Sequence, residues 1–458
     1  MTGEGARYFA PLAWARGAWM RDVLLETDAR GHWSRIEGGA GALERLGATV
    51  LHGPVLPGIV NAHSHAFQRA MAGLAERAGD TADDFWSWRD RMYRAANRIT
   101  PGQLEAVAAF LYAELLQSGY THVCEFHYVH NGVDGKPYAD PLEMSRALAR
   151  AAHRTGIGLT LLPALYIRAG FAAKGLREDQ RRFASTIESV MHVAHAVRGG
   201  ASDSERITAG IAIHSLRAVD KSALKDIAAA ASDMPVHIHL AEQRREVEDC
   251  LVEHGKRPVE FLLEQVRPDE RWNLVHATQC TPDELGLLRN TGAAIVICPS
   301  TEANLGDGVF ELASWLGQSG NWSIGSDSHV TRSWREELRL LEYSQRLHTR
   351  KRNVAASAAV MHGCATALFE GALLGGTAAA GLPLGGLRAG ERADFVVVDR
   401  DAPELAGIPD DHVLDALVFS SPETRFSRVF VAGEEVLAGG EWNEYARDFR
   451  AAMRELWA

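Results

Sequence analysis

The sequence has few cysteines and no long apolar run. Its five cysteines are odd in number and widely spaced, with no C-x-x-C pair, a pattern typical of reduced thiols in a cytosol. The first residues, 1–5, lack the basic and apolar segments of a secretion signal. No window approaches the about 18 uncharged apolar residues that a membrane helix needs. These absences predict a cytoplasmic protein with no membrane partner.

An excess of positive charge is also missing. The chain has 48 Lys and Arg against 59 Asp and Glu, a net charge of −11. Nucleic acids and anionic membranes favour basic surfaces, so neither is expected as a partner. If the substrate is an anion, a few local arginines must recognise it, because the negative net charge of the protein repels it.

What the sequence does contain is a pair of histidines, His63 and His65, at the end of the apolar segment 57–65. Side chains alternate along a strand, so these two imidazoles point the same way and Ser64 points away. Neutral imidazole is the commonest metal ligand in proteins. An isolated H-x-H is also common by chance, with one histidine in the core and the other in a turn. The rest of the chain decides between these interpretations.

Between its two ends the chain alternates strands with helices, the pattern of a parallel α/β sheet. Helical patterns cover 103–117, 222–231 and 281–289, and Thr-Pro pairs at 100–101 and 281–282 predict two helix starts. Eight candidate strands lie near 57–64, 121–127, 157–165, 207–214, 234–240, 272–277, 293–299 and 322–327. Eight such units predict a distorted (β/α)8 TIM barrel, whose active site lies at the carboxyl ends of the strands.

The two ends of the chain have a different sequence pattern. Short apolar segments separated by Gly and Asp turns occur within 7–56 and again at 393–399 and 428–437, which predicts antiparallel strands. Chain termini often lie close together, so these segments are expected to form one small β-sandwich domain. The predicted boundaries are 1–56 plus 384–458 for this domain and 57–383 for the barrel.

The barrel makes a prediction that the sequence can test. If His63 and His65 bind a metal, further ligands should end other strands. His239 and Glu242 end the fifth strand, His276 the sixth and Asp327 the eighth. Four strands that bring such groups to one rim are difficult to explain by packing.

Among these residues His239 is expected nearer the barrel mouth than His237, which is interpreted as a core or supporting residue. Asp327 is expected to bind the metal and to accept a proton from bound water; the alternative is a surface or helix-capping carboxylate. A zinc-like ion lowers the pKa of such a water to about 7. Cys124 and Cys298 lie in apolar strands and are interpreted as small buried hydrophobes, not nucleophiles.

The segments 57–65, 239–242, 276 and 326–328 resemble the amidohydrolase superfamily, and within it the mononuclear deaminase-like branch. The segment 387–395 is similar to that superfamily's small β domain. Binuclear members carry a lysine at the end of the fourth strand. This chain has Ile213–Arg217 there, without lysine, so the resemblance implies one divalent metal, zinc above all. It also implies a homodimer.

Four further segments, 65–73, 86–89, 125–130 and 214–217, resemble members that hydrolyse N-formimino-L-glutamate to N-formyl-L-glutamate and ammonia in histidine degradation. The resemblance implies that Glu242 carries the proton and that His276 polarises the reacting group. It implies that the metal ligands are His63, His65, His239 and Asp327. The alternative for Glu242 is a carboxylate that stabilises a helix N-terminus.

The substrate expected from this resemblance carries two carboxylates. Arginine binds a carboxylate through a planar two-donor fork, and Arg217 and Arg89 are the best candidates. Expected hydrogen-bonding neighbours are Gln68, Tyr128 and His214. Arg89 has a serious alternative, since Arg89, Arg91, Arg94 and Arg98 could line a solvated helix face. Trp86, Trp88 and Tyr93 could line a base-binding pocket, but helix packing is commoner.

Two other functions remain open on these residues. One is an aminohydrolase of a purine or another heterocycle on the same barrel. The other is a barrel relative that has lost catalysis and serves as an assembly subunit. The complete set of histidines, Glu242 and Asp327 argues against the second.

Overall fold

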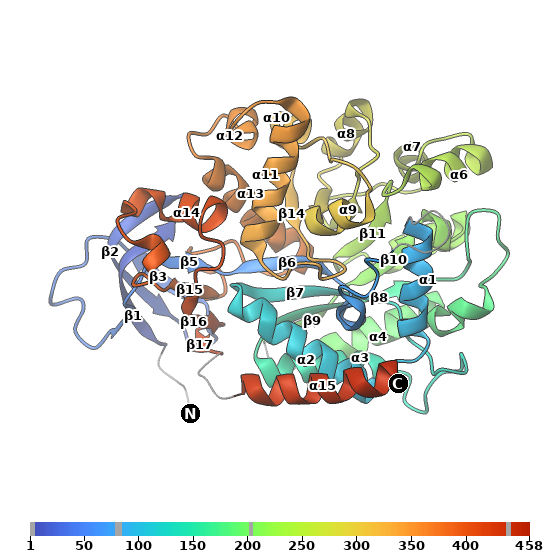
Figure 1. Cartoon of the computed structure of the whole chain (residues 1–458), viewed down its shortest axis with the longest axis horizontal. Coiled ribbons are helices and arrows are strands. Elements are labelled where there is room, and N and C mark those ends of the chain that lie inside the picture. The colour runs from blue at the N-terminus through green and yellow to red at the C-terminus, as the bar shows by residue number, and fades with distance from the viewer. Residues whose placement is uncertain (1–4, 78–84, 201–204, 437–440) are drawn as a thin grey trace.

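The computed structural model of the chain describes residues 5–77, 85–200, 205–436 and 441–458, without the side chains of 85–87. Two sheets organise this part (Figure 1): a parallel barrel and, beside it, a sheet built from both ends of the chain. Three expectations lie outside the described residues: the absence of a secretion signal in 1–4, the side chain of Trp86 and the end of the predicted strand at Leu437.

The first sheet confirms the predicted barrel. Its neighbours run in the order β14-β13-β12-β11-β10-β8-β7-β6, and every pair is parallel. The strands are β6 (Ile59–Ser64), β7 (Tyr120–His127), β8 (Gly158–Leu165), β9 (Ile207–Ala209), β10 (Ile211–Ser215), β11 (Val236–Leu240), β12 (Trp272–His276), β13 (Ala294–Ile297) and β14 (Trp322–Ile324).

The barrel closes between its first and last strands. The Asp327 amide donates to the His63 carbonyl at 3.0 Å, and the His65 amide donates to the Asp327 carbonyl at 3.2 Å. The backbone that closes the barrel therefore belongs to three of the predicted site residues, which fixes them relative to one another.

The predicted fourth strand is divided into β9 and β10 at Gly210. The Gly210 amide donates to the Leu161 carbonyl at 3.0 Å, while a Cβ at this position would lie 2.5 Å from the Pro235 carbonyl oxygen. Only glycine allows the neighbouring backbone to approach so closely. The division is one source of the distortion of the barrel.

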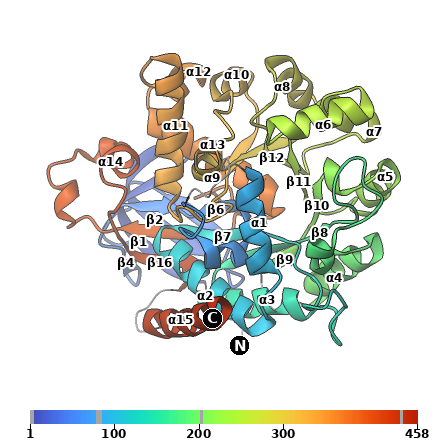
Figure 2. The ribbon, with the colours of Figure 1, turned by 45° about the vertical axis from the view of Figure 1, so that its right-hand side comes forward.

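Helices surround the barrel (Figure 2). Both predicted helix starts are confirmed: Thr100 and Thr281 accept from the third residue of their helices, each in a reciprocal capping box. No helix of the described residues is long and apolar enough to cross a membrane. The helices are α1 (Phe85–Ala96), α2 (Pro101–Gln117), α3 (Glu143–Thr155), α4 (Ile187–Gly200), α5 (Lys221–Ala230), α6 (Arg244–His254), α7 (Pro258–Gln265), α8 (Pro282–Arg289), α9 (Pro299–Leu305), α10 (Leu312–Gly317), α11 (Trp334–Thr349), α12 (Val354–Ala358) and α13 (Cys364–Ala380).

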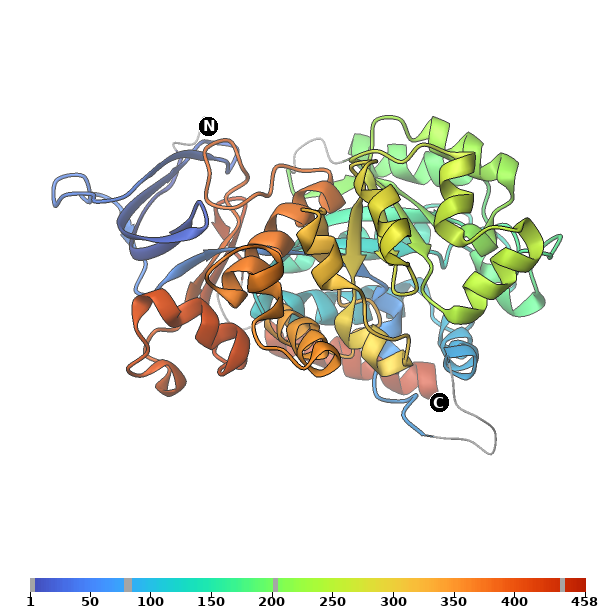
Figure 3. The ribbon, with the colours of Figure 1, turned by 90° about the horizontal axis from the view of Figure 1, so that it is seen from above.

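The second sheet joins the two ends of the chain and curls beside the barrel (Figure 3). Its main order is β17-β16-β15-β5-β1-β2-β3, and β4 pairs with β1. Its own apolar core includes Phe395 and Phe430, whose rings stack with centroids 4.1 Å apart. The strands are β1 (Arg7–Ala15), β2 (Ala18–Thr27), β3 (Trp33–Glu37), β4 (Thr49–Val50), β5 (Val55–Pro57), β15 (Phe395–Val398), β16 (Phe426–Val431) and β17 (Glu434–Glu435).

Two helices in the C-terminal part of the chain lie outside this sheet. α14 (Val413–Phe419) packs on α11 and α13, and α15 (Trp442–Trp457) runs along α2 of the barrel (Figure 1). Phe110 of α2 and Phe449 of α15 stack with ring centroids 4.5 Å apart. The C-terminal segment thus contributes to both parts, and the domain boundaries stay a prediction.

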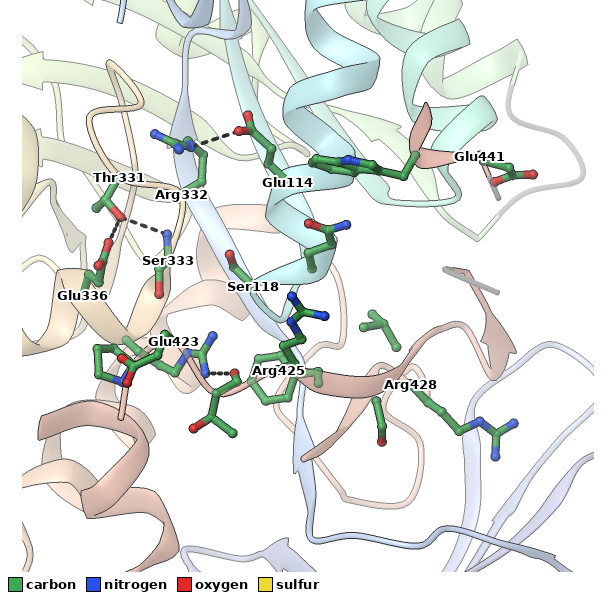
Figure 4. A pocket seen from close by; sticks show the side chains of 18 residues that line it. Glu114, Ser118, Thr331, Arg332, Ser333, Glu336, Glu423, Arg425, Arg428 and Glu441 are labelled. Carbon is green, nitrogen blue, oxygen red and sulfur yellow. Dashed lines mark hydrogen bonds and ion pairs between the residues drawn. The ribbon is translucent and has the colours of Figure 1, made fainter. Parts of the chain in front are cut away.

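A cavity of about 840 Å³ lies at the junction of the barrel with β16 (Figure 4). The groups around it mostly interact with one another. Arg335 donates to the Thr424 carbonyl at 2.5 Å, and Arg332 and Glu114 form an ion pair at 3.6 Å. Its lining contains no histidine and none of the predicted site residues. This cavity is therefore distinct from the site predicted from the sequence.

Candidate metal and active site

Three imidazoles and one carboxylate meet at the mouth of the barrel. The Nε2 atom of His63 lies 3.2 Å from Nε2 of His65 and 3.0 Å from Nε2 of His239. Asp327 Oδ1 lies 3.5 Å from the Nε2 of His63 and 3.4 Å from that of His65. The four side chains, which come from β6, β11 and the turn after β14, thus point their donor atoms at one spot.

This donor set fits a metal ion. Nδ1 of His65 is 2.7 Å from the Phe126 carbonyl, and Nδ1 of His239 is 2.7 Å from the His214 carbonyl. A carbonyl only accepts, so each Nδ1 carries the proton and each Nε2 presents a lone pair. Lone pairs in contact repel unless a cation lies between them, and histidine ligands are commonly oriented by such backbone contacts.

The protonation of these groups agrees with that interpretation. Burial lowers the pKa of His63 to about 3, so this imidazole is neutral at pH 7. Burial likewise lowers the pKa of His65 and His239. Burial alone would raise the pKa of Asp327, but the neighbouring His63, together with His65 and His276, outweighs it and lowers that pKa below its usual range. Neutral imidazoles and an ionised carboxylate are the forms that bind metals.

Backbone strain accompanies two of the site residues. His276 has φ +72° and Asp327 has φ +47°, the left-handed region that residues with a Cβ seldom adopt. Each is placed where its strand ends, and the turn directs the side chain across the barrel mouth. Such conformations persist at sites that the surrounding structure enforces.

Glu242 and His276 form a second group beside the imidazoles. Glu242 Oε1 lies 3.7 Å from His276 Nε2, and Asp327 Oδ2 lies 3.8 Å from the same atom. Burial raises the pKa of Glu242 to about 7, although His276 and Arg217 oppose it. Burial lowers the pKa of His276, but Glu242, Glu302 and Asp327 raise it to about 10. A carboxyl group near neutrality beside a charged imidazole is suited to proton transfer.

The five predicted substrate contacts line one cavity with these groups. Gln68 Nε2 donates to the Tyr128 hydroxyl at 3.1 Å, and the His214 ring lies 4.3 Å from that of Tyr166, centroid to centroid. The cavity is lined by His65, Gln68, Trp88, Arg89, Met92, Tyr93, Tyr128, Tyr166, His214, Arg217, His239, Glu242, His276, Leu305 and Asp327.

Arg217 is a cation of this cavity, with 13% of its side chain exposed. Its ion pairs with Glu242 and Glu246 are long, at 3.9 Å each, and its Nε has no hydrogen-bond partner among the described residues. This Nε faces the Glu246 carboxylate but lies too far from it for a hydrogen bond, so Arg217 keeps donors that a carboxylate from outside the chain can accept. The position suits the predicted role of Arg217 in binding carboxylate.

Arg89 lies on α1 and lines the same cavity, with its guanidinium 5.5 Å from the centre of the Tyr93 ring. Arg91, two residues on, instead donates to the backbone carbonyls of Ala75 and Arg77. Arg91 therefore differs from the other three, but Arg89 also lines an outer cavity with Arg94 and Arg98, and its role in binding substrate stays a prediction.

The structure also locates the residues whose roles were left open. His237 faces α13, where its Nε2 donates to the Ala379 carbonyl at 2.9 Å. All five cysteines are buried and free, as expected for Cys124 and Cys298. Tyr93 and Trp88 line the cavity that contains the predicted site residues.

Several site residues were missed from the sequence. Glu302 lies 3.3 Å from His276 Nδ1, and Glu246 accepts from the amides of Ala241 and Glu242. Glu125 accepts from Ser64 Oγ and the Ala66 amide, both at 2.6 Å, and so braces the H-x-H turn. Glu125 lies near the end of β7, within the segment 125–130 that carries the resemblance, so its position could have marked it; nothing in the sequence marked the other two.

Comparisons with known proteins agree with this geometry. The amidohydrolase family matches residues 55–436. Formimidoylglutamate deiminase of Pseudomonas aeruginosa is 46% identical over 452 residues, 98% of both chains. A 5-methylthioadenosine/S-adenosylhomocysteine deaminase of Halobacterium salinarum is 29% identical over 364 residues, 78% of this chain and 76% of the relative.

Solved structures show the same fold. An amidohydrolase from Brucella melitensis superposes with a TM-score of 0.93 at 42% identity, covering 99% of this chain and 100% of the other. An adenosine deaminase from Xanthomonas campestris with bound zinc gives 0.79 at 21% identity, covering 98% and 99%. The barrel, the imidazole cluster and the match over residues 55–436 lead to one conclusion. The chain belongs to the amidohydrolase family.

Proposed function

We propose that this hydrolase deiminates N-formimino-L-glutamate, giving N-formyl-L-glutamate and ammonia, as a step of histidine degradation. One observation carries the proposal: Arg217, whose buried Nε makes no hydrogen bond among the described residues, lines the same cavity as the imidazole and carboxylate cluster. The name of the Pseudomonas aeruginosa relative, 46% identical over nearly the whole chain, agrees with this substrate.

His63, His65, His239 and Asp327 are proposed to hold one zinc ion. Nitrogen and oxygen donors suit zinc, although iron, cobalt and manganese accept the same set. When bound, such an ion lowers the pKa of a water molecule to about 7 and so supplies a nucleophile at neutral pH.

The chain's own groups then bind the substrate and move protons. Arg217 and Arg89 hold the two carboxylates, with Gln68, Tyr128 and His214 as hydrogen-bonding neighbours. This places the formimino carbon near Glu242 and Asp327. Asp327 accepts a proton from water. The carbon–nitrogen bond to the terminal nitrogen breaks, and that nitrogen needs a proton to leave as ammonia. Glu242, with a pKa of about 7, can take and return a proton near neutrality.

A coupled ammonia assay tests the proposal across formimino-L-glutamate, formimino-L-aspartate, guanine and adenosine. We expect the highest kcat/KM with formimino-L-glutamate. Faster release from a purine would replace the proposal with the heterocycle aminohydrolase, which the aromatic lining at Tyr93 and Tyr166 could accommodate. No release from any of the four would contradict both.

A cytoplasmic location and a homodimer complete the proposal. Five free, buried cysteines are consistent with a reducing compartment, where disulfides do not persist. Sedimentation of the purified protein tests the dimer, and cell fractionation tests the location.

A further inference from the structure

Cys298 lies beside the proposed zinc site, where the sequence predicted only a buried hydrophobe. His276, Cys298 and Asp327 each offer one ligand atom, and these three atoms lie within 4.8 Å of one another. Their exposed fractions are 1%, 0% and 5%. No role proposed above uses the thiol. This group is distinct from the His63, His65 and His239 cluster, except that Asp327 lies close to both.

The two oxygens of Asp327 are divided between these groups. Oδ1 faces His63 and His65, while Oδ2 faces His276 Nε2 at 3.8 Å. Glu242 adds a further oxygen, with Oε1 at 3.7 Å from the same nitrogen. His276 Nε2 therefore lies near two carboxylate oxygens, and the Cys298 sulfur lies within 4.8 Å of this nitrogen-and-oxygen group.

One carboxylate orients two of these groups. Glu302 Oε1 lies 3.3 Å from His276 Nδ1 and accepts from the Cys298 amide at 2.9 Å. The contact to Nδ1 directs Nε2 of His276 toward Asp327, the same orientation that backbone carbonyls give the imidazoles of the zinc cluster. The contact to the amide fixes the backbone from which the thiol projects.

We propose that His276, Cys298 and Asp327, completed by Glu242, form a second and weaker site for a soft divalent cation such as zinc or cadmium. Mixed nitrogen, sulfur and oxygen donors are suited to these ions. In a tetrahedral zinc site, ligand atoms stand about 3.5 Å apart, so the group must contract before it holds an ion. The thiol and the charged His276 must also release a proton each to solvent, since burial holds the pKa of Cys298 well above its usual value and the neighbouring carboxylates raise that of His276 to about 10. Both costs weaken the site.

A cation there inhibits the enzyme. It engages Asp327, Glu242 and His276, which the proposed function needs for proton transfer and for polarising the reacting group. The inhibitory consequence rests on that function, whereas binding itself does not. We expect the protein to retain one firmly bound metal and to lose activity when zinc or cadmium is in excess.

The test titrates the zinc-loaded protein with cadmium and follows the ultraviolet charge-transfer band of a cadmium–thiolate bond. We expect the band to rise with a second equivalent of metal, measured by elemental analysis, and to be absent from Cys298→Ser. Cys124→Ser is the matched control, because Cys124 is also a buried strand thiol. It should behave as wild type.

In the ammonia assay, Cys298→Ser should keep wild-type kcat/KM at low metal and lose at least tenfold in sensitivity to excess zinc. If it does not fold, Cys298→Ala serves the same comparison. A wild-type band that is missing, or one that persists without Cys298, overturns the proposal. If the band behaves as expected but formimino-L-glutamate is not hydrolysed, the cation site stands and the proposed function fails.

Discussion

The partner of Nδ1 distinguishes His276 from the other imidazoles. His65 and His239 each contact a backbone carbonyl through Nδ1, whereas His276 contacts the Glu302 carboxylate. A carboxylate stabilises a protonated imidazole far more than a carbonyl does. Glu242, Glu302 and Asp327 together raise the pKa of His276 to about 10, so the same residue type is neutral at the metal cluster and charged 3.7 Å from Glu242.

Glu302→Gln tests this distinction. The amide cannot offset the charge on His276, so we expect kcat to fall about 10- to 100-fold, the usual cost of removing such a partner. KM and the content of firmly bound metal should change little, because neither the arginines nor the zinc ligands are touched.

Glu337→Gln is the matched control for that variant. Glu337 is also buried and holds α9 through the amide and hydroxyl of Ser300, but it does not contact His276. An equal loss of kcat in the two variants would mean that both act by loosening α9, and the role of Glu302 would be structural.

Arg217→Met tests carboxylate binding. A hydrogen bond to a charged group contributes about 1.5–3 kcal/mol, so kcat/KM for formimino-L-glutamate should fall about 10- to 100-fold. The loss should be smaller for an N-formimino amine that lacks one carboxylate. Wild-type kcat/KM on the full substrate would remove Arg217 from this role.

At the scale of elements, α1 covers the reaction cavity. It contributes Arg89, Met92 and Tyr93 to the lining, and in Figure 2 it crosses in front of the barrel strands. The free volume is only about 50 Å³, whereas ligand sites usually have about 300–1,000 Å³. Side chains of this wall must therefore move before a substrate fits.

Hydrogen exchange can detect this movement. Saturating N-formyl-L-glutamate should slow amide exchange in α1, because the bound product ties Arg89 to the far side of the cavity. α8, on the outside of the barrel, should be unaffected and is the internal control. Unchanged exchange in α1 with product bound would show that the wall does not respond to ligand.

The whole molecule carries a net charge of −11, yet the space outside this wall is basic. A cavity of about 790 Å³ shares Arg89 and Tyr93 with the reaction cavity and is lined by further arginines at 94, 98, 177 and 181. Asp90 and Asp179 also line it, and Glu178 pairs with Arg181 at 3.6 Å. Five guanidinium groups outnumber three carboxylates, so the local field attracts the dianion that the overall charge repels.

We expect kcat/KM to fall as salt rises from about 20 to 300 mM, because screening weakens this attraction. Arg94→Glu with Arg98→Glu should lower kcat/KM several-fold at low salt and flatten the salt dependence, with kcat unchanged. Arg267→Glu with Arg388→Glu changes the net charge equally, away from the cavity. If the two double variants behave alike, local attraction is not involved.

Alternation of strand and helix was enough to predict the barrel, because side-chain periods and caps such as Thr100 and Thr281 are local properties. The same patterns located six residues at or just after strand ends: His63, His65, His239, Glu242, His276 and Asp327. In a barrel these strand ends lie at one rim, so the six side chains must lie near one another. Glu302 and Cys298 could not be assigned in this way. Neither carries a local signal, and their positions beside His276 depend on how α9 packs after β13.

The sequence by itself therefore determined the fold class and the chemical types at the barrel mouth, since both follow from local periodicity and from strand direction. Only the tertiary structure decided which atom of each side chain faces which neighbour. The left-handed turns at His276 and Asp327, the division of the Asp327 oxygens and the two kinds of Nδ1 partner all arise from contacts between distant segments. Those contacts determine which side chains are charged, and the charges determine which of them can bind a metal and which can transfer a proton.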